Sequence, residues 1–312
     1  MGWQSLIVEV AAPDAEAFAE ALLEAGAQSV SVEDADAGTA REAPQFAEPG
    51  DAPQPWERNR IVALFDPEAQ PAGALATALS AIGFNADCSA PPTFRVEPVA
   101  DRDWVRAVQE HFLPLRITGD LWVVPSWCEP PEPEAINLRI DPGLAFGTGS
   151  HPSTRLALAW LASAIREWPR GAPARAARPR VMDYGCGSGI LAIAALKLGA
   201  GEALGVDIDP QALAPSAENA ARNDIAQGAA ALRLCLPDEL PDFRADIVVA
   251  NILARPLIVL APLLAEHAAG RIALSGILAG QGEEVLACYR EWFEISVTAE
   301  EEGWVLLSGQ RR

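Results

Sequence analysis

The sequence predicts an α/β protein in which a smaller N-terminal α+β domain precedes a larger C-terminal domain built on a Rossmann-like sheet. A length of 312 residues, half of them hydrophobic, suits about two domains. From residue 136 onward, short apolar strands alternate with helices, which is typical of a parallel sheet covered on both faces. Before residue 100 the order strand, helix, strand occurs twice, which suits a ferredoxin-like sandwich.

The N-terminal elements follow from hydrophobic periodicity and from the residues that begin and end helices. Strands are expected at Ser5–Val10, Ser29–Glu33, Arg60–Phe65 and Thr93–Val99, and helices at Asp14–Ala25 and Gly73–Ile82. The stretch from Asp34 to Asn59 is acidic and rich in proline. We expect it to be an exposed excursion with little core of its own.

A linker region is expected over residues 101–138, between an N-terminal domain at 1–100 and a C-terminal domain at 139–312. A helix is predicted at Asp101–Phe112, because apolar residues repeat along one side of it. Two short strands, Leu115–Thr118 and Leu121–Val124, should follow. The segment Cys128–Glu134 contains three prolines and is predicted to be a stiff loop outside any core.

The C-terminal domain is expected to alternate strands and helices and to finish in a pair of strands. Strands are predicted at Arg180–Tyr184, Ala203–Asp207, Ile247–Ala250, Arg271–Ser275, Phe293–Thr298 and Trp304–Gly309. Helices are predicted at Ser153–Glu167, Leu191–Leu198, Pro210–Asn223, Arg255–Glu266 and Gly280–Arg290.

Composition excludes several classes of protein. No apolar run reaches the roughly 20 residues of a membrane span, and the N-terminus lacks the pattern of a secretory signal, so a cytoplasmic protein without membrane contact is expected. Five scattered cysteines and three histidines offer no ligand spacing for a metal. The net charge of −20 is divided as −16 over residues 1–138 and −4 over 139–312. This balance argues against direct nucleic-acid binding, and the acidic half would suit either a basic partner or simple solubility.

The segment DYGCGSG carries the most direct chemical signal. Glycine stands at every second position, Gly185, Gly187 and Gly189, of the turn that joins a predicted strand to a predicted helix. Glycine there permits positive φ and the close approach of a ligand. A dinucleotide fingerprint would have the spacing G-x-G-x-x-G, with a pyrophosphate on the helix start. Here Asp183 precedes the first glycine, and a carboxylate at that place suits an ammonium group better than a diphosphate.

Two further side chains follow predicted strands. Asp207 lies 22 residues after Gly185 and could accept both ribose hydroxyls of an adenosyl group; the alternative is an acidic loop end without a role. Asn251 closes the apolar strand IVVAN, although asparagine is also a common helix cap. Ligands of open parallel sheets bind outside the carboxyl ends of the strands, so these groups should converge on one crevice.

These residues resemble the class I, seven-stranded methyltransferases that use S-adenosylmethionine. The segments DPGLAFGTGSHPSTRLAL, NILARPL and LSGIL resemble more closely the PrmA family of ribosomal protein methyltransferases. The resemblance covers most of the chain, because WVRAVQEHFLPLRITGDLWVVPSW is similar to the family's linker region and the N-terminal pattern to its substrate-recognition domain. The glycine turn occurs across the superfamily, whereas FGTGSHPST is specific to this family.

The resemblance implies the activity and the residues that carry it. The enzyme would transfer methyl groups from S-adenosylmethionine to amines of protein eleven of the large ribosomal subunit, on lysine side chains and the N-terminal amine, and would be monomeric. The implied cofactor contacts are Thr154, Gly185, Gly187, Asp207 and Asn251. The implied catalytic residues are Asn251, Phe146 and Thr148, the last two in a loop over the methyl group.

The chemistry of amine methylation constrains the site further. A lysine must first lose its proton, which costs on the order of 4 kcal/mol near neutral pH. His151 could serve as a base, or could have a structural role beside Pro152. Other amino-methylating enzymes hold planar amides or bases with an Asn-Pro-Pro-aromatic sequence, which Ile252 and Leu253 replace here. A flexible aliphatic amine therefore fits better.

Two other functions remain open from the sequence. An NAD-dependent oxidoreductase could use a similar sheet, although the G-x-G-x-G spacing argues against it. A non-catalytic adaptor could hold a basic partner with its acidic N-terminal half.

Overall fold

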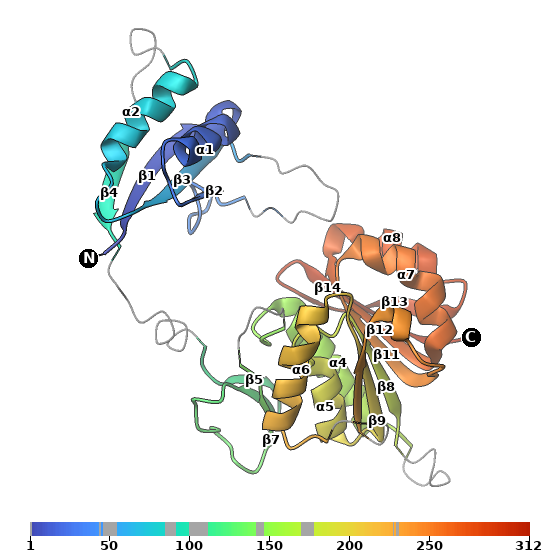
Figure 1. The fold of residues 1–312 in the computed structure, drawn as a ribbon. Helices are drawn as coiled ribbons and strands as arrows, with labels where there is room; N and C mark the ends of the chain where they lie inside the picture. Colours follow the sequence, from blue (N-terminus) through green and yellow to red (C-terminus); the bar gives the residue numbers. More distant parts are fainter. Residues whose placement is uncertain are drawn as a thin grey trace. The chain divides into compact units, whose positions relative to one another are not determined.

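The computed structural model describes residues 2–43, 45, 55–84, 92–99, 112–141, 147–169, 178–226, 228 and 231–312. The chain divides into two compact units, residues 1–107 and residues 108–312. Figure 1 shows both units, and each is described by itself below.

The N-terminal unit is a ferredoxin-like sandwich. Its strands are β1 (Gln4–Ala11), β2 (Ser29–Asp34), β3 (Arg58–Phe65) and β4 (Phe94–Pro98), and its helices are α1 (Ala15–Glu24) and α2 (Pro71–Ala81). A 3-10 turn, Ala12–Asp14, leads into α1. The sheet has the order β2-β3-β1-β4 with antiparallel neighbours, as the predicted double βαβ pattern requires.

Alternation along the strands gives this unit its core. Leu6 and Val8 of β1 are fully buried, as are Phe18 and Leu22 of α1. They form one cluster with the inward-facing residues of β3 and α2, which are Ile61, Ala63, Phe65, Leu75 and Ala78.

The acidic excursion is fixed where it leaves the sheet. Asp34, the last residue of β2, accepts hydrogen bonds from the backbone nitrogens of Asp36 and Ala43, each at 2.8 Å. Trp56 donates from its indole nitrogen to the carbonyl of Ala43 at 2.7 Å. The middle of the excursion and residues 101–111 of the helix predicted at Asp101–Phe112 lie outside the described residues.

The C-terminal unit contains a seven-stranded sheet of order β10-β9-β8-β11-β12-β14-β13. The first five strands in this order are parallel, and β14 runs antiparallel to both β12 and β13. The strands are β8 (Arg180–Tyr184), β9 (Glu202–Val206), β10 (Leu232–Cys235), β11 (Ala245–Asn251), β12 (Ala268–Leu278), β13 (Phe293–Glu301) and β14 (Trp304–Arg311). This is the predicted fold class, although the sequence did not predict β10.

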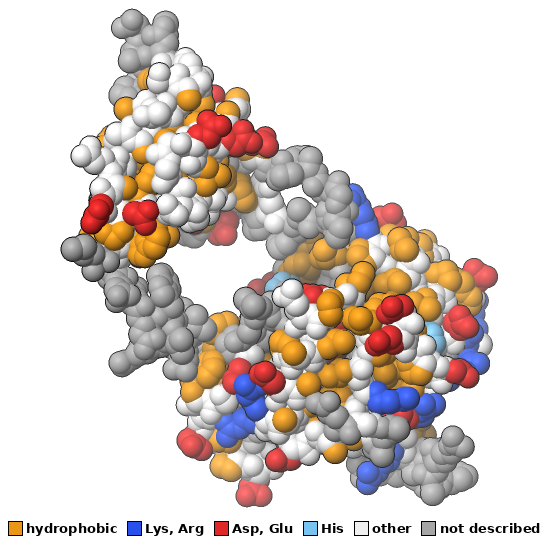
Figure 2. All heavy atoms as spheres, in the orientation of Figure 1, with side chains coloured by type: hydrophobic (Ala, Val, Ile, Leu, Met, Phe, Trp, Pro, Cys, Tyr) orange, Lys and Arg blue, Asp and Glu red, His pale blue; other side chains and the backbone are white. Residues whose placement is uncertain are grey.

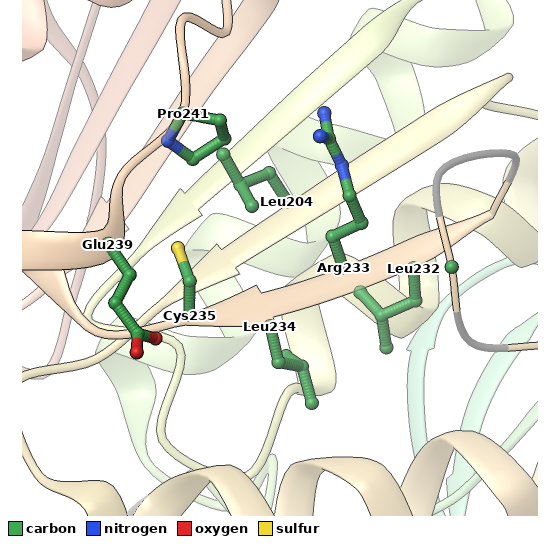
Figure 3. A pocket seen from close by; sticks show the side chains of 8 residues that line it. Leu204, Leu232, Arg233, Leu234, Cys235, Glu239 and Pro241 are labelled. Carbon is green, nitrogen blue, oxygen red and sulfur yellow. The ribbon is translucent and has the colours of Figure 1, made fainter.

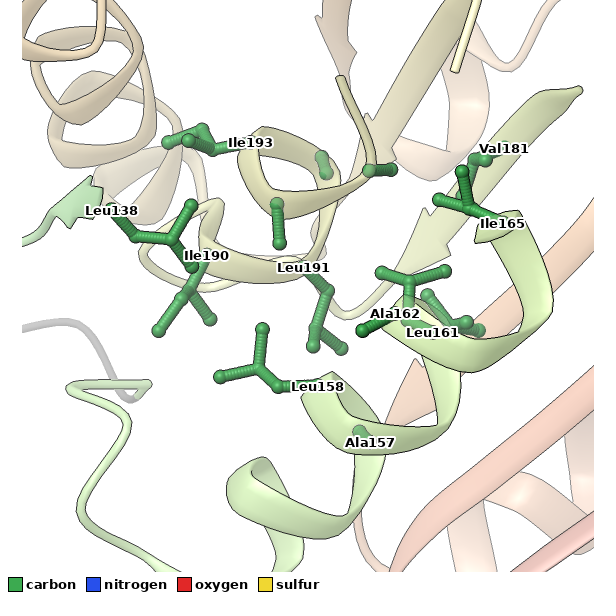
Figure 4. Close-up of a cluster of buried hydrophobic side chains, with 14 of the residues drawn as sticks. Leu138, Ala157, Leu158, Leu161, Ala162, Ile165, Val181, Ile190, Leu191 and Ile193 are labelled. Carbon is green, nitrogen blue, oxygen red and sulfur yellow. The ribbon is translucent and has the colours of Figure 1, made fainter. Parts of the chain in front are cut away.

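Helices cover both faces of the sheet (Figure 1). They are α4 (Pro152–Arg166), α5 (Ile190–Leu198), α6 (Pro210–Arg222), α7 (Ala254–His267) and α8 (Gly282–Tyr289), with 3-10 turns at Pro237–Glu239 and Ala279–Gln281. Adjacent residues of β8 point to opposite faces, so Val181 packs among α4 and α5 while Met182 packs among α7 and α8. Figure 4 shows the first of these clusters, in which Leu158 and Leu191 face each other.

A three-stranded sheet lies beside α4 and α5 in the same unit. Its strands are β5 (Leu115–Thr118), β6 (Leu121–Val124) and β7 (Ile136–Arg139), and β7 was not predicted. Leu121 and Leu138 are fully buried in the cluster that covers one face of the large sheet. The strands between residues 115 and 139 therefore share the core of the C-terminal unit. Within the described ranges, no helix has both the length and the apolar character needed to cross a membrane.

Gly276 provides a test of how the sheet is assembled around Ile252. Gly276 has φ +81°, and a Cβ there would lie 2.5 Å from the carbonyl oxygen of Ile252. We expect Gly276→Ala to lower the free energy of unfolding by about 2–4 kcal/mol, because both the backbone conformation and the contact become strained. Gly280→Ala is the matched control, since a Cβ at Gly280 meets nothing within 4 Å. Urea unfolding measures both, and equal effects would contradict this assignment.

Candidate active site

The strand register brings three predicted residues to one edge of the large sheet. Tyr184 of β8 pairs with Val206 of β9 and with Ala250 of β11, so these three residues lie at one level. The residues that follow them in the chain are Gly185 after β8, Asp207 after β9 and Asn251, the last residue of β11. At about 4.8 Å per strand, Asp207 and Asn251 lie roughly 10 Å apart across Gly185. The sequence-based expectation that they converge agrees with this register.

The glycine turn has a left-handed backbone that residues other than glycine rarely adopt. Gly185, Gly187 and Gly189 have φ values of +77°, +52° and +77°. A Cβ on Gly185 would lie 2.2 Å from Cγ2 of Ile252, so the aliphatic side chain that follows Asn251 covers this turn directly. The turn begins where the backbone nitrogen of Gly185 donates to the carbonyl of Val206 at 2.7 Å.

Helix α6 supports the same turn from its side chains. Ser216 donates its hydroxyl to the carbonyl of Gly187 at 2.6 Å, and Asn219 donates its amide to the carbonyl of Ser188 at 3.0 Å. Both side chains are almost fully buried. With these carbonyls occupied, the backbone of the turn is held in a single arrangement.

Asp207 is held by backbone amides on two sides. One carboxylate oxygen accepts from the nitrogen of Gly187 at 2.7 Å, and the other accepts from the nitrogen of Asp209 at 3.0 Å. Asp209 begins α6 and caps it by accepting from the nitrogen of Gln211 at 2.8 Å. The carboxylate of Asp207 is thus fixed at the strand end and keeps lone pairs for a ligand.

Ile208 is a feature of the edge that the sequence analysis missed. Its side chain is 84% exposed between Asp207 and Asp209, the most exposed large hydrophobic side chain in the described part of the chain. An isoleucine between two aspartates, directly after a buried strand, was the available signal. Such a side chain offers an apolar face next to the fixed carboxylate.

Asp183 is a buried carboxyl beneath the glycine turn. Its side chain is 1% exposed, and one oxygen, Oδ2, accepts from the nitrogen of Ala192 in the first turn of α5 at 3.0 Å. The other oxygen, Oδ1, is buried without a partner. Burial raises the pKa of this carboxyl to about 7 and the charge of Asp207 adds to the rise, while the Ala192 hydrogen bond opposes it.

Asn251 presents a second unpaired acceptor on the neighbouring strand. Its Nδ2 donates to Oγ1 of Thr154 at 3.1 Å, which fixes the side-chain amide. Its Oδ1 is buried and has no partner. Thr154 itself is fully buried at the start of α4, so the structure places its side chain behind Asn251.

The glycine-rich segment ahead of α4 is connected to the turn. Ser188 donates its hydroxyl to the carbonyl of Gly147 at 2.6 Å, where Gly147 has φ +105°. Thr148 lies one residue further, with its hydroxyl 2.9 Å from that of Ser150. The predicted residue Phe146 lies outside the described residues.

His151 has structural contacts at the end of this segment. Its Nδ1 caps α4, lying 2.7 Å from Oγ of Ser153 and accepting from the nitrogen of Ser153 at 3.3 Å. The ring packs edge-on against Trp304 with the centroids 4.6 Å apart. Partial burial lowers the pKa of His151, and the nearby charge of Arg155 lowers it further. These contacts explain His151 without a proton-transfer role.

A separate cavity lies along the edge strand β10 (Figure 3). Its walls include Leu204, Arg233, Cys235 and Glu239, and it contains none of the residues gathered at the strand ends. Among the residues that the structure describes, no group of three or more His, Cys, Asp or Glu side chains is placed to hold a metal ion.

Comparison with known proteins gives one consistent family. The family model for ribosomal protein L11 methyltransferase (PrmA) matches residues 2–312. A ribosomal protein L11 methyltransferase of Paraburkholderia phytofirmans is 50% identical over 318 residues, covering 100% of this chain and 99% of that protein. A protein of the same name from Burkholderia vietnamiensis is 49% identical over 318 residues, again covering 100% of this chain and 99% of that protein.

A solved structure agrees with these relatives. The ribosomal protein L11 methylase of Lactobacillus delbrueckii subsp. bulgaricus is 34% identical and superposes with a TM-score of 0.55. The match covers 64% of this chain and 100% of that one.

Asp183 should make stability depend on pH. Its pKa of about 7 in the folded chain lies above the ordinary value of 3.8, so between these values the folded chain holds a proton that the unfolded chain releases. The free energy of unfolding therefore falls as pH rises through this window. Relative to the unchanged protein, we expect Asp183→Asn to gain a few kcal/mol between about pH 4 and pH 7. Urea unfolding across this range measures the difference, and a pH-independent difference would refute the assignment.

Proposed function

The chain belongs to the ribosomal protein L11 methyltransferase (PrmA) family, and on that premise we propose how its residues align a substrate amine with a methyl donor. Membership makes the chain an S-adenosylmethionine-dependent methyltransferase. The NAD-dependent oxidoreductase and the non-catalytic adaptor considered from the sequence are not supported by these relatives. The observation that carries the proposal is the pair of buried, unpartnered acceptors on β8 and β11, Asp183 Oδ1 and Asn251 Oδ1.

The residues at the strand ends fit S-adenosylmethionine, which when bound supplies an electrophilic methyl group on a sulfonium. Asp183 would accept a hydrogen bond from the ammonium of the methionine part, which removes the cost of a buried carboxylate with a free oxygen. Asp207 would accept the ribose hydroxyls, and the exposed Ile208 would cover the adenine. Gly187 carries no Cβ, so a ligand could approach its backbone closely. At Gly185 the space of a missing Cβ is taken by Ile252, so Gly185 is proposed to contact the ligand through its backbone.

Asn251 is assigned to the substrate amine. Its Oδ1 can accept an N–H of a neutral amine, which turns the nitrogen lone pair toward the methyl group. Thr154, which the resemblance implies as a cofactor contact, would also act through Asn251, because its hydroxyl holds the amide and its side chain is fully buried. Thr148, and Phe146 outside the described residues, are proposed to line the loop over the methyl group.

The protonation of the amine also favours this arrangement. A lysine near neutral pH pays on the order of 4 kcal/mol to expose its lone pair. Asn251 carries no charge, so it accepts from the neutral amine without stabilising the ammonium form as a carboxylate would. The aliphatic side chain of Ile252 next to it keeps water away from the amine, since it covers Gly185 closely.

The relatives are named for ribosomal protein L11, and we propose the same substrate here, with lysine side chains and the N-terminal amine as acceptors. The N-terminal unit would present this substrate. On the face in Figure 2 its described part shows acidic side chains and no visible basic ones. Several of its arginines are paired with acids, such as Arg58 with Glu9 at 2.8 Å. We further propose that the enzyme acts as a cytoplasmic monomer without direct nucleic-acid contacts.

Replacing Asn251 should separate catalysis from cofactor binding. We expect Asn251→Ala to lower kcat by about 100-fold or more, because the amine loses its alignment, while the Kd for S-adenosylmethionine changes less than about threefold. Thr154→Val should lower kcat by roughly tenfold, since Asn251 remains but is no longer held. Steady-state kinetics with purified L11 and calorimetric titration of the cofactor measure these effects. Asn251→Ala with normal kcat would refute the assignment.

Replacing Asp207 should affect cofactor binding first. We expect Asp207→Ala to weaken S-adenosylmethionine binding by about 50-fold or more, because charge-assisted hydrogen bonds to both ribose hydroxyls are lost. Asp209→Ala is the matched control, because this neighbouring carboxylate caps α6 and should leave the Kd nearly unchanged. Similar losses in the two variants would show that the ribose assignment is incorrect.

Removing the N-terminal unit should separate cofactor binding from methyl transfer to L11. Residues 108–312 alone, a range that keeps β5 to β7 in its core, should bind S-adenosylmethionine with nearly full affinity. They should lose most methyl transfer to L11, measured by mass spectrometry of the product. Full transfer by this shorter chain would overturn the proposed role of the N-terminal unit.

A further inference from the structure

Arg155 connects the glycine-rich segment to a distant hairpin. It lies in the first turn of α4, and its side chain is only 22% exposed. Its Nη1 donates to the carbonyl of Ser150, its Nε donates to Glu301 at 2.8 Å, and its Nη2 lies 2.9 Å from Glu302. One guanidinium thus joins a backbone carbonyl to two carboxylates 146 and 147 residues further along the chain.

The hairpin that receives Arg155 joins β13 to β14. Glu301 ends β13, and Glu302 occupies the tight turn with φ +51°, a left-handed conformation that is uncommon outside glycine. Trp304 begins β14 and packs against the ring of His151. The hairpin therefore contacts the first turn of α4 through the ion pair of Arg155, and it contacts His151, which precedes α4, through an aromatic pair.

These contacts fix one side of the segment that contains Thr148. On the other side, Ser188 of the glycine turn donates to the carbonyl of Gly147. Thr148 lies between this hydrogen bond and the Arg155 contact to Ser150. Gly147 and Gly149 lack a Cβ, and glycine has wide conformational freedom, so their positive-φ backbone depends on such external contacts to stay in one arrangement.

We propose that Arg155 is a positioning residue for methyl transfer, which holds the Gly147–His151 segment against the β13–β14 hairpin and thereby keeps Thr148 in place at the acceptor site. The inference rests on the proposed function, because it gives the segment its role over the methyl group. Arg155 reaches no reacting group itself. The hairpin, remote in sequence, becomes part of the structure that sets the catalytic geometry.

Glu301 should contribute more than Glu302 to holding Arg155 in place. Glu301 is 36% exposed, accepts a hydrogen bond from Nε of Arg155 and lies 2.8 Å from its Nη2, whereas Glu302 is 68% exposed and accepts from Nη2 alone. An exposed partner contributes little because water and salt screen it. Loss of Arg155 would also leave the carbonyl of Ser150 without this donor.

The test compares full-length variants acting on purified L11. We expect Arg155→Gln to lower kcat by about 10- to 100-fold while the Kd for S-adenosylmethionine changes less than threefold, because displacement of a positioning loop affects turnover rather than cofactor contacts. Arg155→Lys should be intermediate, since a lysine keeps the charge but cannot serve all three acceptors at once. Glu301→Gln should lower kcat more than Glu302→Gln.

A matched ion pair in the same unit provides the control. Arg290, just after α8, contacts Glu283 in the first turn of α8 at 2.7 Å and neither residue belongs to the segment or to the β13–β14 hairpin, so Arg290→Gln should leave kcat unchanged. The proposal is overturned if Arg155→Gln keeps kcat within about twofold of the unchanged enzyme, or if its loss of kcat is matched by an equal loss of cofactor binding. A fully active Asn251→Ala would instead refute the proposed function, so the two failures are distinguishable.

Discussion

The register of the parallel strands is the constraint on which the rest of the site depends. Because Val206, Tyr184 and Ala250 pair at one level, the next residues of β9, β8 and β11 emerge side by side at one edge of the sheet. The glycine turn follows the central strand of these three, where the absence of a Cβ on Gly185 lets Ile252 pack directly over it. A slip of one residue in any strand would turn these side chains to the opposite face.

Two buried acceptors on these strands, Asp183 Oδ1 and Asn251 Oδ1, have no hydrogen-bond partner. The free energy that this costs the folded chain is consistent with a ligand-binding role. An unpaired buried acceptor costs about 1–3 kcal/mol, and a buried carboxylate costs more. Burial raises the pKa of Asp183 to about 7, so below that pH the ligand-free chain avoids the cost of a buried carboxylate by keeping this group protonated. Near neutral pH the proton is held weakly enough to be displaced by a ligand ammonium. The extensive cores on both faces of the sheet make such local costs tolerable.

The sequence predicted the parts of the site that depend on local rules. The placement of Gly185, Asp207 and Asn251 at one edge was predictable, because each ends or follows an apolar strand and parallel strands end at the same edge. Their roles toward a ligand stay proposals. The position of Thr154 behind Asn251 was not predictable, because it depends on where α4 begins relative to β11. The contact between Arg155 and Glu301 spans 146 residues and leaves no local pattern. The strands β5 and β6 are as short as β7 and β10, but Gly119 and Asp120 mark a hairpin turn between them. The strands β7 and β10 pair in parallel with β6 and β9, so no turn signal accompanies them and they were not predicted.

In the proposed complex, Asp183 Oδ1 accepts a hydrogen bond from the cofactor ammonium and Asn251 Oδ1 accepts one from the substrate amine. A crystal structure of the chain with S-adenosylhomocysteine tests it most directly. The account predicts the cofactor ammonium within about 3.2 Å of Asp183 Oδ1, the ribose hydroxyls on Asp207, and Asn251 Oδ1 facing the sulfur without a protein partner. An ammonium bound elsewhere, with Asp183 Oδ1 still unpaired, or a cofactor seated in the cavity beside β10, would contradict it.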